Sequence, residues 1–86
     1  MPLSETDALL FRQLCIEAEM RCSKRSARRA ERHDDSGSRH FADLASQYQR
    51  LRATIAENSG TLDTSSVLKD IVRLANKEQD PKYHAG

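Results

Sequence analysis

The residues with the clearest chemical potential are six cations in the first half of the chain. They fall at offsets of 0, 3, 4, 7, 8 and 11 residues, the spacing that places side chains on one face of an α-helix. This basic stripe consists of Arg21, Lys24, Arg25, Arg28, Arg29 and Arg32. Five of the six are arginines, whose planar guanidinium groups bind carboxylates and phosphates through paired hydrogen bonds. The stripe therefore predicts a surface that binds anionic groups.

Charge is unevenly distributed along the chain, although the net charge of the whole chain is only +1. Residues 1–20 sum to −3, residues 21–40 sum to +4, and the remainder sums to zero. Arg39 and His40 belong to the basic segment and would enter a second helix beside the end of the first. We therefore add Arg39 to the candidate partner- or phosphate-binding residues.

Three interpretations of the basic stripe stay open at this point. Acidic residues early and basic residues late in a helix complement its macrodipole, so the stripe could simply solvate a long exposed helix. It could instead dock an acidic protein partner, because complementary charge speeds and orients association. Third, it could contact the phosphates of DNA or RNA, although the pI of 7.8 and the lack of interleaved aromatic residues argue against this.

Other side chains offer little for catalysis or metal binding. The candidate ligands have no tight spacing, since both cysteines and the first two histidines stand seven residues apart: Cys15, Cys22, His33, His40 and His84. The three glycines are isolated, so no phosphate-binding loop is present. A lowered thiol pKa at Cys22, beside three cations, is conceivable, but a small buried side chain is the simpler interpretation. We expect no enzymatic activity, no metal and no cofactor.

Apolar spacing predicts that helices carry these residues. Ser4 and Asp7 form a loose capping pair before an apolar repeat that indicates a helix over about 5–33, formed by Leu10, Phe11, Leu14, Cys15, Ala18 and Cys22. In an alternative interpretation this helix breaks near Ser23. The small residues opposite the basic stripe would let a neighbouring helix approach closely: Cys22, Ser23, Ser26, Ala27 and Ala30.

A turn and two further helices follow. In the segment 34–38, Gly37 can supply a positive φ, and a second helix over about 38–58 follows from a regular 3-4 repeat of Phe41, Leu44, Tyr48, Leu51 and Ile55. We expect Tyr48 to be a core residue with its hydroxyl satisfied. Gly60 is placed for a left-handed helix end. A short third helix covers about 64–79, and 81–86 form a flexible tail.

The fold class predicted from these features is all-α: an antiparallel helical hairpin with a short third helix, in one domain over 1–80. A thin core in so short a chain leaves completion by a homodimer as one option. Leu9, Ile16 and Met20 form a spare apolar strip on the first helix that, like the third helix, could contact a partner.

Function is expected to be stoichiometric binding in the cytoplasm. The N-terminal residues have no basic region typical of a signal peptide, and no apolar run is long enough to cross a membrane. We predict a small regulator or adaptor that binds an acidic protein partner through the basic face or the spare apolar strip. The alternative is a nucleic-acid-associated protein that contacts phosphates through the same arginines.

Overall fold

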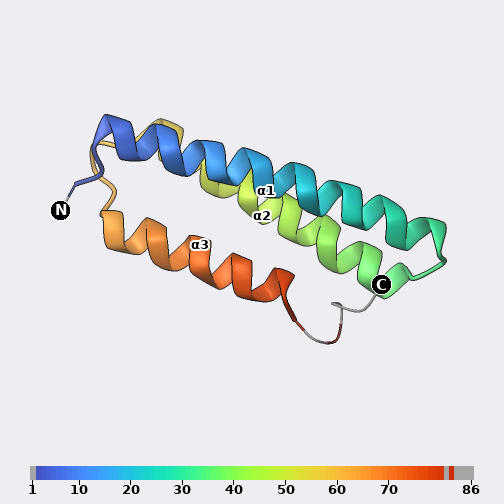
Figure 1. The fold of residues 1–86 in the computed structure, drawn as a ribbon. Helices are drawn as coiled ribbons and strands as arrows, with labels where there is room; N and C mark the ends of the chain where they lie inside the picture. Colours follow the sequence, from blue (N-terminus) through green and yellow to red (C-terminus); the bar gives the residue numbers. More distant parts are fainter. Residues whose placement is uncertain (1, 81, 83–86) are drawn as a thin grey trace.

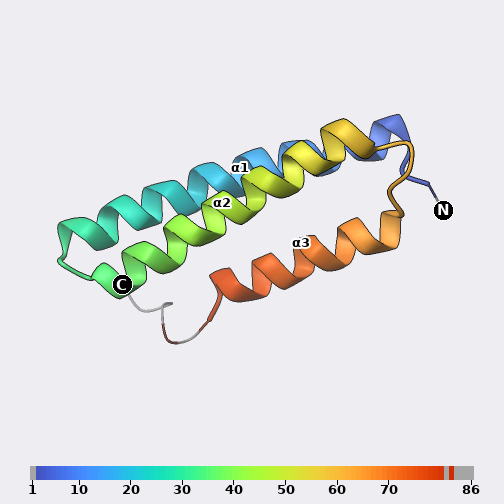
Figure 2. The ribbon, with the colours of Figure 1, turned by 180° about the vertical axis from the view of Figure 1, so that it is seen from behind.

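Three helices make up the fold, which we describe for residues 2–80 and 82 of a computed structural model. They are α1 (Glu5–Glu31), α2 (Asp35–Asn58) and α3 (Thr64–Glu78). The first two lie side by side as an antiparallel hairpin, and α3 turns back to run in the same direction as α1 (Figures 1 and 2). The predicted all-α hairpin with a short third helix is confirmed. Helix α1 is continuous through Ser23.

Each helix begins at a side chain that caps its free backbone amides. Ser4 accepts a hydrogen bond from the Asp7 amide (3.1 Å), which confirms the predicted capping pair of α1. Asp34 caps α2 by accepting from the Gly37 amide (2.9 Å), and Asp63 caps α3. Such caps satisfy donors that have no partner within the helix, and each contributes about 1 kcal/mol.

In the hairpin turn, the residue in the left-handed conformation is not the one that the sequence predicts. His33, not Gly37, has a positive φ, 61°. The amides of His33 and Asp34 donate to the carbonyls of Ala30 (3.0 Å) and Arg29 (2.9 Å), the paired bonds of a Schellman motif. Gly37 lies within α2, which begins at Asp35 rather than at residue 38. Gly60 does not take a positive φ either.

Small residues of α1 face large residues of α2 in the core. Cys15, Ala18 and Cys22 are buried on α1, opposite the buried aromatic and aliphatic side chains of α2, which are Phe41, Leu44, Tyr48 and Ile55. The prediction that Ser23, Ala27 and Ala30 face a neighbouring helix was wrong, because these three residues are exposed. Leu10 and Leu14, expected on the buried face of α1, are exposed as well.

Helix α3 adds only a narrow buried edge to the hairpin. Val67 and Leu74 are buried, and Ile71 packs against the same core. The loop before α3 is fixed to the N-terminal segment, since the Leu3 amide donates to the Leu62 carbonyl (2.9 Å). The predicted C-terminal tail lies outside the described residues except for Lys82. Among the described helices, none combines the length and apolar character required to cross a bilayer.

Candidate functional site

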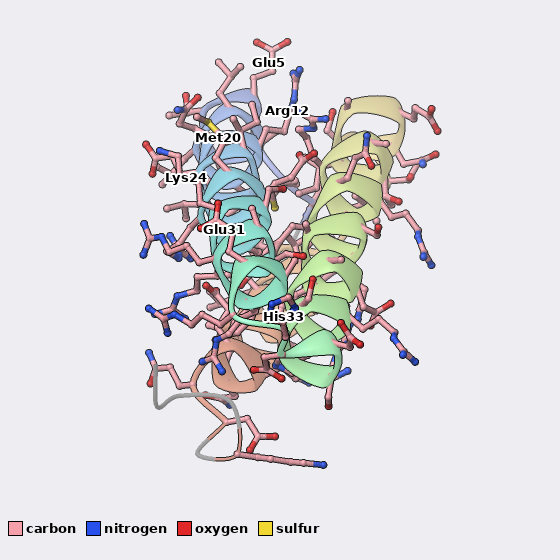
Figure 3. All side chains as sticks on the ribbon, turned by 90° about the vertical axis from the view of Figure 1, so that its right-hand side faces the viewer. Glu5, Arg12, Met20, Lys24, Glu31 and His33 are labelled. Atoms are coloured by element: carbon pink, nitrogen blue, oxygen red, sulfur yellow. The ribbon has the colours of Figure 1, made fainter. Side chains whose placement is uncertain are left out.

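The basic stripe divides into two rows with different surroundings. Residues four apart along α1 lie nearly above one another, so the stripe contains one row formed by Arg21, Arg25 and Arg29 and another formed by Lys24, Arg28 and Arg32. Arg29 is buried and Arg25 half-buried, whereas every member of the second row is exposed. We call these the inward row and the outward row. Figure 3 shows Lys24 on the side of α1 that points away from α2.

Two members of the inward row fasten the turn of the hairpin. The guanidinium groups of Arg25 and Arg29 lie over the Phe41 ring, 5.3 and 5.5 Å from its centroid. Arg29 also donates to the Asp34 carboxylate (2.9 Å), the group that caps α2. Ser26 extends this contact by donating to the Ser38 carbonyl (2.8 Å). Cation–π contacts and a half-buried ion pair therefore engage these two arginines within the fold.

Arg21, the third member of the inward row, holds the end of α3. It donates two parallel hydrogen bonds to the buried Glu78 carboxylate, from Nε to Oε1 (2.8 Å) and from Nη2 to Oε2 (3.0 Å). The buried Tyr48 hydroxyl donates to Oε2 of the same carboxylate (2.7 Å). Tyr48 is therefore a core residue with a satisfied hydroxyl, as the sequence predicts. This Glu78 cluster joins all three helices, and sequence patterns did not predict it because its members stand up to 57 positions apart.

Protonation in the Glu78 cluster follows from burial and hydrogen bonding. Burial alone would raise the pKa of Glu78, but the hydrogen bonds from Arg21 and Tyr48 and the positive charge of Arg21 outweigh it, so the pKa lies below its ordinary value. Burial, together with the adjacent carboxylate, raises the pKa of Tyr48. Glu78 is thus ionised and Tyr48 neutral at pH 7, as their hydrogen bonds require.

The three cations of the outward row and Arg39 on α2 are exposed, as is Arg21 despite its hydrogen bonds to Glu78. Lys24 and Arg28 make no ion pair with any described residue. Arg39 is exposed on α2, where it lines a shallow hollow with Asp35, Ser36 and His40. His40 turns toward α3 and donates to the Lys77 carbonyl (2.9 Å). The cations that sequence reasoning grouped together therefore lie on different sides of the molecule.

Two pairs of exposed apolar side chains lie on α1 and on α3. Leu10, Leu14, Leu68 and Val72 are each between 42 and 55% exposed. Leu10 and Leu14 share one stripe of α1 with Arg21, which contacts α3 through Glu78. On α3, Leu68 and Val72 share a stripe with Ala75, which lines a hollow together with Arg21 and Arg25. Helices α1 and α3, which carry the two apolar pairs, run in the same direction (Figure 1).

The apolar group continues into the outward row. The residues at offsets 0, 4, 7, 11, 14 and 18 of this side of α1 are Leu10, Leu14, Glu17, Arg21, Lys24 and Arg28. Their character changes from apolar to basic toward the hairpin turn. Helix α3 ends at Glu78, opposite Arg21, and so flanks only the apolar part. We call the surface formed by Leu10, Leu14, Leu68, Val72, Lys24 and Arg28 the α1–α3 face.

The spare apolar strip borders the outward row on α1, because Met20 lies one helical turn before Lys24. Leu9 and Met20 are 63 and 56% exposed, and Ile16 is half-buried. Figure 3 shows Met20, like Lys24, pointing away from α2. This strip consists of three apolar residues on a single helix, whereas the α1–α3 face combines side chains from two helices. The α1–α3 face therefore has four large exposed apolar side chains, against two on the spare apolar strip.

The two cysteines have the properties of core residues. Both are fully buried, and burial raises the pKa of Cys15 to about 11 and that of Cys22 to about 12. The idea of a lowered thiol pKa at Cys22 was wrong, because desolvation exceeds the effect of the nearby arginines. Among the described residues, no three His, Cys, Asp or Glu side chains gather in a way that could hold a metal ion.

Comparison with known proteins adds no relative from which a function could be transferred. No family model, curated protein or solved structure matches this chain.

Proposed function

We propose that this chain is a small, non-enzymatic interaction protein of the cytoplasm, a regulator or adaptor that binds a protein partner through the α1–α3 face. The observation that carries the proposal is that four large apolar side chains, two on α1 and two on α3, are exposed to solvent. Contiguous apolar surface bordered by polar residues is typical of protein-interaction sites. Lys24 and Arg28 of the outward row continue this surface and favour an acidic partner.

Nucleic-acid binding receives less support from the same geometry. Strong binding to phosphates would draw on five or six cations, because each phosphate contact contributes to the salt-dependent affinity. Arg21 and Arg29 already pair with Glu78 and Asp34, and Arg25 is half-buried over an aromatic ring. Within the basic stripe, Lys24 and Arg28 are exposed cations without an ion-pair partner among the described residues, and Arg39 is on another helix. This arrangement suits a local acidic contact better than a phosphate backbone.

The proposal can be tested by differential capture from a lysate of the source organism. Tagged wild-type protein is compared with the double variant Leu14→Glu/Leu68→Glu, which places charge on the α1–α3 face. The matched control is Leu9→Glu/Met20→Glu, which places the same charge on the spare apolar strip. Circular dichroism verifies that all three proteins are equally helical.

The expected result is a defined set of proteins that the wild type and the control retain and the α1–α3 variant loses, as quantified by mass spectrometry. Equal recovery by both double variants would contradict the proposal, as would retention of nothing above a tag-only control. Nuclease treatment of the lysate separates protein partners from nucleic acid. Loss of all captured material on nuclease treatment would favour the nucleic-acid alternative.

A further inference from the structure

The α1–α3 face carries more information than its apolar area alone, because its charge changes along the length of α1. Leu10 and Leu14 lie near the N-terminal end, next to Glu17, and the exposed cations Lys24 and Arg28 lie near the hairpin turn. An occupant of this face would therefore contact apolar side chains at one end and cations at the other.

Building on the proposed function, we propose that the occupant is an amphipathic helix of a partner protein that is acidic in its N-terminal half and lies antiparallel to α1 and α3. Its apolar stripe would pack on Leu10, Leu14, Leu68 and Val72, completing a four-helix arrangement. Its acidic residues would lie over Lys24 and Arg28, where α3 has already ended.

The charge of the face and the geometry of helices together give this orientation. Acidic side chains stabilise the first turns of a helix, where the macrodipole is positive, so an acidic half is most favourable at the N-terminus. Antiparallel placement brings that half to Lys24 and Arg28. It also sets the dipole of the bound helix against those of α1 and α3, which run in the same direction as each other (Figures 1 and 2).

Lys24 and Arg28 are available to a partner because their side chains form no ion pair within the described residues. Among the described residues, neither has an ion-pair partner, whereas Arg21 and Arg29 of the inward row are paired within the fold. Binding an acidic helix therefore breaks no intramolecular ion pair of these two cations. Glu17, between the apolar and basic parts, favours a basic residue further along the bound helix.

The probe is a synthetic 18-residue helical peptide with a leucine stripe, glutamates flanking the stripe in its first half and lysines in its second half. A matched peptide carries glutamine in place of every glutamate. Fluorescence anisotropy in 50 mM salt gives their affinities for the full chain. We expect the glutamate peptide to bind at least about fivefold more tightly, with most of this difference lost in 500 mM salt.

Variants of the protein locate the contact. Lys24→Glu/Arg28→Glu should abolish the preference for the glutamate peptide, and the control Arg39→Glu/Arg50→Glu, two charge reversals on exposed residues of α2, should retain it. Leu14→Glu/Leu68→Glu should weaken both peptides at least about tenfold. A spin label on the peptide N-terminus should broaden the amide signals around Lys24 and Arg28 rather than those around Leu10.

The outcomes separate this inference from the proposed function. If both peptides bind equally and Leu14→Glu/Leu68→Glu weakens both, the face binds helices but the acidic requirement is wrong. Broadening around Leu10 would overturn the antiparallel orientation. If neither peptide binds, the helix-docking inference is overturned, while capture of a partner remains a separate result. Self-association by light scattering that the same leucine variant removes would identify a second copy as the occupant, and would also overturn the inference.

Discussion

The strongest structural prediction concerns Glu78, the buried carboxylate that fastens α3 to the hairpin. Glu78→Ala removes the acceptor of the Tyr48 hydroxyl, which belongs to a side chain only 2% exposed. Leaving such a donor without a partner costs about 1–3 kcal/mol. Arg21 is 51% exposed and can return to water, so its lost ion pair adds less than about 1 kcal/mol. Loss of the buried Cγ methylene adds about 1 kcal/mol.

The predicted decrease in the free energy of unfolding is therefore about 2–5 kcal/mol. A chain of this length is stable by roughly 4–13 kcal/mol, so the change removes a large share of the total. It corresponds to a fall in Tm of about 10–40 °C. Urea and thermal unfolding followed by circular dichroism at 222 nm measure both quantities. Glu57→Ala, an exposed carboxylate on α2, is the control and should change stability by less than about 0.5 kcal/mol.

A double-mutant cycle with Tyr48→Phe tests the physical reason for this cost. When Tyr48→Phe is already present, no hydroxyl is left without an acceptor, so Glu78→Ala should cost about 1–2 kcal/mol less than in the wild type. The physical explanation is refuted if Glu78→Ala costs under about 0.5 kcal/mol, or if the two substitutions are additive.

Three further predictions follow from the caps, the carboxylates and the thiols. Because the pKa of Glu78 is lowered on folding, its contribution to stability is present above its ordinary pKa of 4.5 and is lost as the pH falls below it; urea unfolding between pH 3 and 6 should show this loss, and Glu78→Gln should make the curve shallower. A Cβ at Gly37 would collide with Oδ2 of Asp34, so Gly37→Ala should destabilise α2 by about 1 kcal/mol although alanine favours helices. Gly60→Ala, where a Cβ meets nothing within 4 Å, should be tolerated, and equal Tm values for the two glycine variants would contradict this interpretation of the cap. Both cysteines should resist alkylation by iodoacetamide at pH 8 in the folded protein and react once it is unfolded in urea, as followed by mass spectrometry; rapid labelling of the folded protein would contradict their burial.

Periodicity predicted the helices well because local residue types determine them. The repeat from Phe41 to Ile55 gave α2, and continuous helix-forming residues around Ser23 gave an unbroken α1. The helix ends shifted by up to three residues because capping geometry decides them. His33 takes the left-handed conformation and Asp34 reaches the Gly37 amide, and both depend on how the two helices meet rather than on residue type alone.

The candidate site was predicted only in part, because tertiary packing decides which side of a helix faces its neighbours. The spacing of the basic stripe is helical, as expected, but spacing cannot tell which row faces a neighbour. Arg25 and Arg29 turn inward because the Phe41 ring offers them a face, and Arg21 does so because Glu78 lies opposite. Glu78 continues the apolar stripe of α3 at offsets 0, 4, 7 and 11, and a carboxylate on that stripe was the available signal of this contact.

Exposure of Leu10 and Leu14 has the same origin. Their spacing fits a buried stripe, and a third helix packed closer to α1 would have buried them. Instead Cys15, Ala18 and Cys22 form the centre of the contact with α2, and α3 contacts the hairpin along a narrow edge. The apolar residues that stay exposed as a result form part of the α1–α3 face, the candidate binding surface.

The central claim is that the α1–α3 face, and not the basic stripe as a whole, is the surface that binds. Backbone amide chemical-shift mapping of ¹⁵N-labelled protein during titration with the glutamate peptide tests it most directly. We predict that the largest changes fall on residues of α1 and α3 around Leu14, Arg28 and Val72, with the amides near Arg39 unchanged. Changes centred on Arg39 or on Leu9 and Met20, or no changes at millimolar peptide, would contradict it.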